Sequence, residues 1–249
     1  MLEILPFILI GFIAQFVDSA IGMAFGTLTS TLLLLAGIPP QTLSATVHTA
    51  EIFGGSASAF SHWRMGNIDR ELLKKLAVPA LIGAVIGTLL LTLFSNEGLK
   101  PWLGLYFTII GLVILTKAIK PGWIAPIHIH RRVLGFFGGF LDAFGGAGWG
   151  EFVSSGLVLR GFEIRKSVGS MVTVEFMVSV VVTVVFVGTV GITNWPVIFA
   201  VAAGAIAAAP LGAWACKVAP AKPLKIIVGL TISIIGLKTF AAGLGIFTH

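Results

Sequence analysis

Apolar stretches of about 20 residues recur from one end of this chain to the other, and an α-helix needs about that length to cross a bilayer. Only 10% of the 249 residues are charged and 57% are hydrophobic, whereas soluble domains carry about a quarter charged residues. These proportions exclude a soluble globular domain and a disordered chain. An outer-membrane barrel is excluded because its strands alternate in polarity over about ten residues. The sequence therefore predicts an all-α polytopic membrane protein.

The chain also contains an internal repeat. The stretch GFIAQFVDSAIGMAFG, which starts at Gly11, returns as GFFGGFLDAFGGAGWG, which starts at Gly135. The matched pairs include Asp18 with Asp142, Gly22 with Gly146, Gly26 with Gly150, Thr49 with Thr173 and Glu51 with Glu175. Carboxylates are rare inside membrane spans, so acidic residues matched at a constant offset indicate duplication more strongly than matched glycines do. The chain is predicted to contain two copies of one unit.

Each copy consists of one long glycine-rich segment followed by three ordinary spans. The expected segments are 3–36, 41–61, 72–95 and 101–118 in the first copy, and 133–159, 166–188, 196–216 and 223–246 in the second. This pattern divides the chain into a first membrane repeat at 1–119, a cytoplasmic linker at 120–132 and a second membrane repeat at 133–249.

Basic residues predict how the two copies are oriented. Fourteen of the 16 lysines and arginines lie in four short stretches, 64–75, 117–132, 160–166 and 217–225. Since Lys and Arg are enriched in cytoplasmic loops, these stretches should be cytoplasmic and both termini extracytoplasmic. The basic loop 160–166 corresponds to the uncharged loop 37–41 of the first copy. We therefore expect inverted-topology repeats, as in many secondary transporters.

The long glycine-rich segments are predicted to be re-entrant helical hairpins. Segment 133–159 begins and ends on the cytoplasmic side, yet its roughly 27 residues are too few for two complete crossings. It is expected to turn at Asp142–Gly146, and its counterpart at Asp18–Gly22. For the first segment, 3–36, a single long tilted helix is the alternative. The predicted topology has six full spans and two opposed hairpins.

The two turns form the predicted substrate site. The second half of a broken helix aims free N–H groups at the membrane centre, and a helix start attracts anions. Glycines such as Gly22, Gly145 and Gly146 let a ligand approach the backbone, although glycines also serve close helix packing. We expect the anion between the N–H groups around Ser19–Gly22 and those around Ala143–Gly146.

Five carboxylates lie deep in the predicted spans and hairpins. Asp18 and Asp142 either cap the second half-helix or carry protons. Glu51 and Glu175 lie about ten residues into their spans, roughly 15 Å deep and near the bilayer midplane. Carboxylates at that depth usually mark an ion path or proton relay, with a permanently protonated hydrogen-bond donor as the alternative. Glu151, in the returning arm of the second hairpin, is the third expected proton-coupling residue.

Neighbouring polar side chains complete the predicted site. His48 lies one helical turn before Glu51 and can share a proton with it, although its counterpart Val172 gives it no support from the repeat. A structural hydrogen bond is the alternative for His48. Hydroxyl groups occupy matching places in the two copies, although most hydroxyls in membrane helices bond their own backbone. They belong to Thr46 and Thr49 in the first copy and to Ser170 and Thr173 in the second.

Other chemistry finds little support in the residue pattern. The single cysteine, Cys216, excludes internal disulfides and a cysteine metal cluster. A metal site needs several convergent ligands, and His48 with Glu51 supplies only two, so neither a metal nor a cofactor is expected. An enzyme is not expected because the G-x-S-x-G motif of hydrolases is absent. The net charge of +6 lies mostly in short loops, so no nucleic-acid partner is needed to explain it.

Residues 16–69 carry three features that resemble one known family. They are the D-x-x-x-G pattern from Asp18 to Gly22, the G-x-P-P turn at Gly37–Pro40 and the sequence SATVH at the start of the second span. The family is that of the TauE/SafE sulfite exporters, also called toluene-sulfonate uptake permeases. A partial echo at 134–175 fits its duplicated architecture. The resemblance implies a multi-pass transporter of small sulfur-containing anions, such as sulfite, sulfonates or sulfoacetate-like compounds.

Together these features predict a secondary transporter that moves such an anion across the cell (inner) membrane by alternating access. Glu51, Glu175 and Glu151 would couple the movement to protons, with His48 assisting. The alternative is a cation/proton exchanger, because the deep carboxylates suit a cation by charge. A non-transporting scaffold is disfavoured by the matched deep polar residues. The expected partners are the small anion and the lipid bilayer, and a homodimer is left open.

Overall fold

A computed structural model describes residues 4–93, 96–120, 130–158, 163–218 and 221–244 of the chain. The described residues form ten α-helices and no strand, which confirms the all-α class. The helices are α1 (Ile4–Ile21), α2 (Phe25–Leu35), α3 (Pro40–Arg64), α4 (Arg70–Leu91), α5 (Asn96–Ile119), α6 (Arg131–Gly145), α7 (Trp149–Val158), α8 (Ile164–Gly188), α9 (Trp195–Ala215) and α10 (Ala221–Gly243).

Six of the described helices are long and apolar enough to cross a membrane, which makes the chain a multi-pass membrane protein. They are α1, α4, α5, α8, α9 and α10. The predicted span 41–61 is not among them, although it forms the 25-residue helix α3. Helix α3 is less apolar because it carries polar side chains such as Ser44, His48 and Glu51, and the other helices bury them. Helix α1, predicted only as a hairpin arm, is apolar enough to span.

Both glycine-rich segments are broken into two helices. The first breaks at 22–24, between α1 and α2, so the alternative of one long helix over 3–36 is wrong. The second breaks at 146–148, between α6 and α7. Positive φ angles of 69° at Gly22 and 66° at Gly146 end the first helices, and a side chain would disfavour both. The breaks begin at the last residue of each predicted turn, so Asp18 and Asp142 still lie on α1 and α6.

Two pairs of helices pack in parallel through glycines. Helix α1 packs on α9, and α4 packs on α6. The contacts run in the same direction along both helices of each pair: Ile8 with Gly204 and Phe16 with Gly212, then Leu76 with Gly135 and Phe140 with Gly87. A Cβ atom at any of these glycines would overlap the facing backbone, so only glycine allows the helices to approach this closely.

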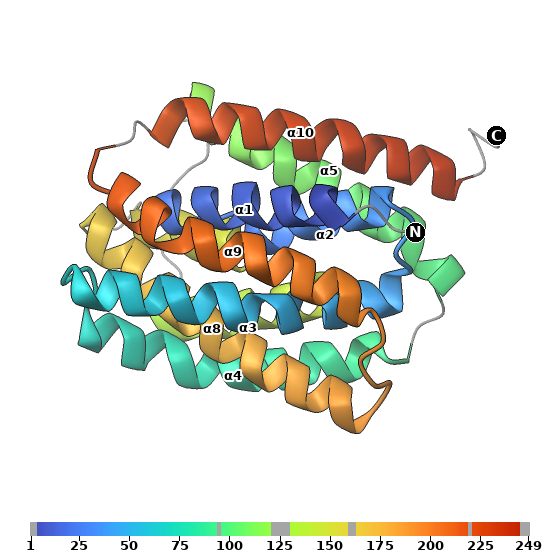
Figure 1. Cartoon of the computed structure of the whole chain (residues 1–249), viewed down its shortest axis with the longest axis horizontal. Coiled ribbons are helices and arrows are strands. Elements are labelled where there is room, and N and C mark those ends of the chain that lie inside the picture. Colours follow the sequence, from blue (N-terminus) through green and yellow to red (C-terminus); the bar gives the residue numbers. More distant parts are fainter. Residues whose placement is uncertain (1–3, 94–95, 121–129, 159–162, 219–220, 245–249) are drawn as a thin grey trace.

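Two further pairs pack antiparallel. Helix α3 packs on α8 in the interior, and α5 packs on α10 along one edge of the bundle (Figure 1). Contacts run in opposite directions along the pairs: Thr49 with Thr183 and Gly55 with Phe176, then Gly104 with Phe240 and Gly229 with Leu115. Each of these four pairs therefore joins one helix from the first half of the chain to one helix from the second.

The basic connections meet at one end of the bundle. Lys166, at the start of α8, donates to the carbonyl of Gly66 at 2.7 Å. Arg131, at the start of α6, lies 3.6 Å from Glu71 in the first turn of α4. The first turn of α1 and the last turn of α10 lie toward the opposite end (Figure 1).

Candidate functional site

A buried imidazole lies between two carboxylates in the interior of the bundle. His48, on α3, has no exposed surface. Its Nδ1 atom lies 3.1 Å from the hydroxyl of Ser179 on α8 and 3.4 Å from a carboxylate oxygen of Glu51. Its Nε2 atom lies 3.2 Å from the backbone carbonyl of Asp142 on α6 and 4.0 Å from the Asp142 carboxylate. We call these four residues the His48 cluster.

Ser179 completes a continuous hydrogen-bond chain within the His48 cluster. Its hydroxyl donates to Glu51 Oε2 at 2.7 Å while it faces His48 Nδ1. The three helices that supply the cluster are α3, α6 and α8, so both halves of the chain contribute. No member of the cluster is more than 2% exposed. A proton held there is therefore shielded from bulk water.

Asp142 also fixes the start of the second half-helix of its hairpin. Its carboxylate accepts from the N–H of Trp149, the first residue of α7, at 3.3 Å. Its backbone carbonyl accepts from the N–H of Ala147 at 3.1 Å. The carboxylate therefore has the capping contact that was one of the two roles expected of it.

The position of the breaks places most of the predicted anion-binding N–H groups at the ends of the first helices. Residues 19–21 end α1 and residues 143–145 end α6, where backbone N–H groups bond preceding carbonyls, and the N–H of Gly22, directly after α1, donates to the Asp18 carbonyl at 2.6 Å. The first N–H groups of a helix are the unbonded ones. They belong instead to the first turns of α2 and α7, where the N–H of Trp149, the first residue of α7, is already bonded to the Asp142 carboxylate.

The two hairpin turns lie against each other. A Cβ atom at Gly26 would come within 2.9 Å of the Gly146 carbonyl and within 3.4 Å of the Asp142 carboxylate. Reciprocally, a Cβ atom at Gly150 would overlap the backbone of Met23. Glycine at 26 and 150, which are matched positions of the repeat, thus permits the starts of α2 and α7 to meet.

Three hydroxyls hold the second turn in place. Ser30 on α2 donates to the Gly146 carbonyl, and Ser44 on α3 donates to the Ala143 carbonyl at 2.8 Å. Tyr106 on α5 donates to the Ala147 carbonyl at 2.7 Å. The Tyr106 ring also packs against Gly145, where a Cβ would come within 2.8 Å of it.

A second buried polar chain surrounds the end of α1. Gln15 donates to Asp18 at 3.4 Å and to Ser19 at 3.1 Å, and Ser19 shares a 2.7 Å hydrogen bond with Ser58 on α3. The hydrogen-bond chain extends to His62, whose Nε2 atom lies 2.9 Å from the Ser19 carbonyl. Two of the predicted site residues, Asp18 and Ser19, therefore belong to this second hydrogen-bond chain.

The predicted threonine and serine hydroxyls are not gathered around the cluster. Thr46, Thr49 and Thr173 each donate to the carbonyl four residues earlier in their own helix. Thr46 also accepts from Asn194 at the uncharged end, whereas Ser170 exchanges hydrogen bonds with the Asp69 backbone at the basic end. Of these hydroxyls, that of Thr49 also lies at the contact between α3 and α8, 3.5 Å from the Thr183 hydroxyl. Thr46 and Ser170 therefore lie far from each other in the described structure, and their role in substrate binding stays a prediction.

Of the two remaining predicted glutamates, Glu175 and Glu151, the structure describes the side chain of Glu175 alone. Glu175 is buried on α8, one turn before Ser179. The side chain of Glu151 lies outside the described part of the structure, so its predicted role stays a prediction.

Ser179 is the site residue that sequence reasoning missed. Its repeat counterpart is Gly55, so Ser179 has no matched polar partner in the sequence. A helical signal was available, because Glu175, Ser179 and Thr183 follow one another at intervals of four and share a face of α8. Gln15, Ser58 and His62 also lack polar counterparts in the repeat and were not predicted.

Comparison with known proteins places this architecture among membrane transporters. Residues 7–239 match the family described as Sulfite exporter TauE/SafE. The probable membrane transporter protein YtnM of Bacillus subtilis (strain 168) is 34% identical over 249 residues, with 96% of this chain and 83% of that protein covered. The probable membrane transporter protein ORF9 of Sinorhizobium sp is 30% identical, with 90% and 88% covered. The probable membrane transporter protein YdhB of Bacillus subtilis (strain 168) is 29% identical, with 95% and 98% covered. These descriptions are of transporters and not of enzymes.

Proposed function

The chain belongs to the TauE/SafE family of sulfite exporters and is a multi-pass membrane transporter, and from that premise we propose that it is a proton-coupled carrier of a small sulfur-containing anion. Sulfite, a sulfonate or a sulfoacetate-like compound fits this class. The proposed location is the cell (inner) membrane. The observation that carries the proposal is the hydrogen-bond chain from His48 through Ser179 to Glu51.

The hydrogen-bond chain from His48 to Glu51 can hold one proton on either His48 or Glu51 without losing a hydrogen bond. In the first state, His48 donates from both ring nitrogens and Ser179 donates to an ionised Glu51. In the second state, a protonated Glu51 donates to Ser179, which donates to Nδ1 of a neutral His48. The proton passes when Ser179 takes the Nδ1 proton and gives its own to Glu51. Nε2 keeps its proton in both states because the Asp142 carbonyl can only accept.

The proposed anion site is the pair of half-helix starts at the contacting turns. The starts of α2 and α7 offer backbone N–H groups and partial positive charge, which suit an oxyanion. The Asp142 carboxylate occupies the Trp149 N–H in the described structure. An oxyanion competes with this carboxylate for the same donor. We therefore couple the two events: protonation of Asp142 weakens its bond to Trp149 and makes room for the anion.

Alternating access between two inverted repeats would provide the movement. It is supported by the helix directions, since α3 and α8 run antiparallel, as do α5 and α10. It is also supported by the reciprocal contacts of Gly26 and Gly150. The inverted halves could open the contact between the turns to one side at a time. Glu175, at the position matched to Glu51, is the proposed second coupling group, and Glu151 the third.

Transport in liposomes tests the proposal. Purified protein should accumulate radiolabelled sulfite or a labelled sulfonate when a pH gradient is imposed, and a protonophore should collapse the accumulation. Glu51→Gln should remove the pH dependence, whereas Glu71→Gln, an exposed carboxylate that pairs with Lys75 outside the site, should keep it. A pH profile that is unchanged in Glu51→Gln would remove proton coupling from the proposal.

A cation/proton exchanger is the second candidate, and one observation favours it. His48, Glu51 and Asp142 each offer a ligand atom, and these atoms lie within 4.8 Å of one another. An imidazole and two carboxylates can bind a divalent transition metal. In the same liposomes, flux of such a cation without any flux of oxyanions would favour exchange over anion transport.

A further inference from the structure

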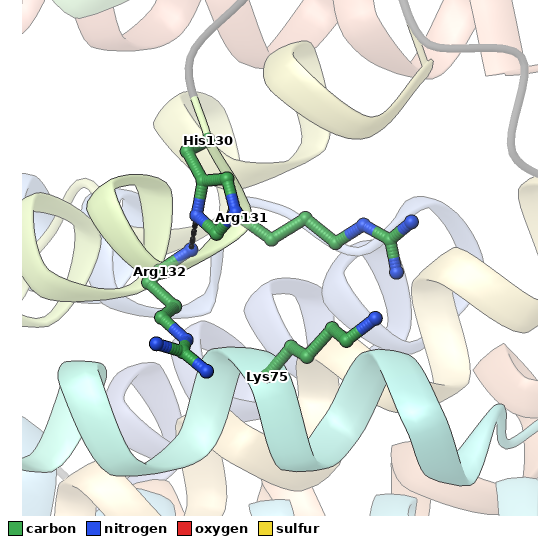
Figure 2. A pocket seen from close by; sticks show the side chains of 4 residues that line it. All are labelled: Lys75, His130, Arg131 and Arg132. Carbon is green, nitrogen blue, oxygen red and sulfur yellow. Dashed lines mark hydrogen bonds between the residues drawn. The ribbon is translucent and has the colours of Figure 1, made fainter.

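A basic cavity lies at the end of the bundle, away from the His48 cluster. It has a volume of about 390 Å³ and is lined by Lys75 on α4 and by His130, Arg131 and Arg132 at the start of α6. Figure 2 shows the side chains of Arg131, Arg132 and Lys75 extending into the space between the two helices. Nothing in the transport proposal uses these residues.

The cavity carries excess positive charge. Glu71, one turn before Lys75, pairs with Lys75 and lies 3.6 Å from Arg131. Three cationic side chains, those of Lys75, Arg131 and Arg132, line the cavity, so its described lining is positively charged. Arginine forks bind phosphate oxygens two at a time, and lysine adds a point charge.

The start of α6 adds to this field. His130 caps the helix by accepting from the N–H of Arg132 at 3.3 Å, and the cavity therefore adjoins a helix N-terminus. The partial positive charge there favours an anion. The cations and the helix start both favour a ligand with phosphate oxygens.

Exposed apolar side chains near the cavity favour a lipid, rather than free phosphate, as the ligand. One turn and two turns beyond Lys75, α4 exposes Val78 and Ile82, and α6 exposes Val133 and Phe137 beyond Arg132. Exposed apolar side chains on helices embedded in the membrane face acyl chains. A phosphate held in the cavity would thus have an apolar surface directly beneath it, as a phospholipid requires and a free phosphate does not.

We propose that this cavity binds the headgroup phosphate of an anionic phospholipid in the leaflet at the basic end. Lys75, Arg131 and Arg132 neutralise the headgroup, while the acyl chains lie along Val78 and Phe137. Basic pockets between membrane helices bind anionic headgroups in this way, with about 1 kcal/mol from each lysine or arginine near the surface. The site would anchor α4 and α6 at one depth in the bilayer.

Lipid binding by the purified full-length chain tests this site. Native mass spectrometry with phosphatidylglycerol should give a lipid-bound species that phosphatidylcholine does not match. Arg132→Gln and Lys75→Gln should each weaken phosphatidylglycerol binding about fivefold, the equivalent of one surface charge. The control Lys74→Gln removes the same charge from an exposed neighbour that does not line the cavity, and should leave affinity unchanged.

Two further measurements make the result decisive. Arg132→Lys keeps the charge and should retain most of the binding, which separates lost recognition from lost folding. Inorganic phosphate at millimolar concentration should neither compete for the lipid nor raise the melting temperature as phosphatidylglycerol does. Equal binding of the two lipids, an equal loss in Lys74→Gln, or full competition by inorganic phosphate would overturn the proposal.

Discussion

His48 Nε2 lies 3.2 Å from the backbone carbonyl of Asp142, so the first half of the chain contacts the hairpin of the second half at a titratable ring. This carbonyl also accepts from the N–H of Ala147 inside the turn. Any movement of the hairpin away from α3 must break the His48 contact. Under the proposed function, protonation in the His48 cluster would therefore be linked to movement of this hairpin relative to α3.

The first prediction concerns Ser179. Ser179→Ala leaves His48 Nδ1 and Glu51 Oε2 3.4 Å apart with no hydroxyl between them, which is longer than an efficient hydrogen bond. We expect the rate of proton-driven transport to fall about tenfold, because loss of the Ser179 hydrogen bonds would raise the barrier to proton transfer by roughly 1.4 kcal/mol. The measurement is anion uptake in liposomes as a function of pH. Ser233→Ala, which removes a hydroxyl that donates to its own helix, is the control, and equal effects of the two variants would contradict the role of Ser179.

The sequence could predict most of the fold because its signals are local. Apolar length predicts spans, and the positions of Gly22 and Gly146 predict both breaks to within a few residues. Apolar length does not explain helix α3, which is less apolar than the other long helices. Its polar side chains are stabilised by contacts with α6 and α8, and these contacts cannot be predicted from a local sequence pattern. Long-range packing decides which of its faces is buried.

The site could be predicted only in part. His48, Glu51 and Asp142 each stand out as deep titratable residues, but their meeting depends on how α3, α6 and α8 pack. The repeat does not bring its matched hydroxyls together, because Thr46 and Ser170 lie at opposite ends of the bundle. The matched residues Gly26 and Gly150 instead each lie against the turn of the other copy.

The second prediction concerns the left-handed backbone of the first turn. Ala24 has φ of 103°, a conformation that side chains disfavour by about 1–2 kcal/mol. Its repeat counterpart, Gly148, adopts φ of 122° without that cost. Ala24→Gly should therefore raise stability by up to about 1 kcal/mol, because greater freedom of the unfolded chain offsets part of the gain. Thermal unfolding in detergent measures it, and a lower melting temperature would show that Ala24 is not strained.

The third prediction concerns the glycine contact between α1 and α9. Gly204→Ala places a Cβ atom against the Ile8 carbonyl, and a rigid helix backbone cannot yield cheaply. We expect a loss of about 1–3 kcal/mol, the usual cost of overpacking. Gly188→Ala is the matched control, because a Cβ atom there meets nothing within 4 Å. Equal melting temperatures for the two variants would mean that α1 and α9 can separate without cost.

The last prediction tests the inverted arrangement of the repeats. Arg64 is the last residue of α3, at the basic end, and Thr189, directly after α8, is its counterpart once the one-residue insertion of the second copy is counted. Both are exposed, so cysteines introduced there should react with a membrane-impermeant maleimide. We expect Arg64→Cys to react only from the cytoplasmic side and Thr189→Cys only from the outside. The native Cys216 is replaced in both variants, although burial raises the pKa of its thiol and already slows its reaction near neutral pH. Labelling of both positions from one side would place the two copies in the same orientation, and the opposed half-helix starts proposed to bind the anion would then lack their structural basis.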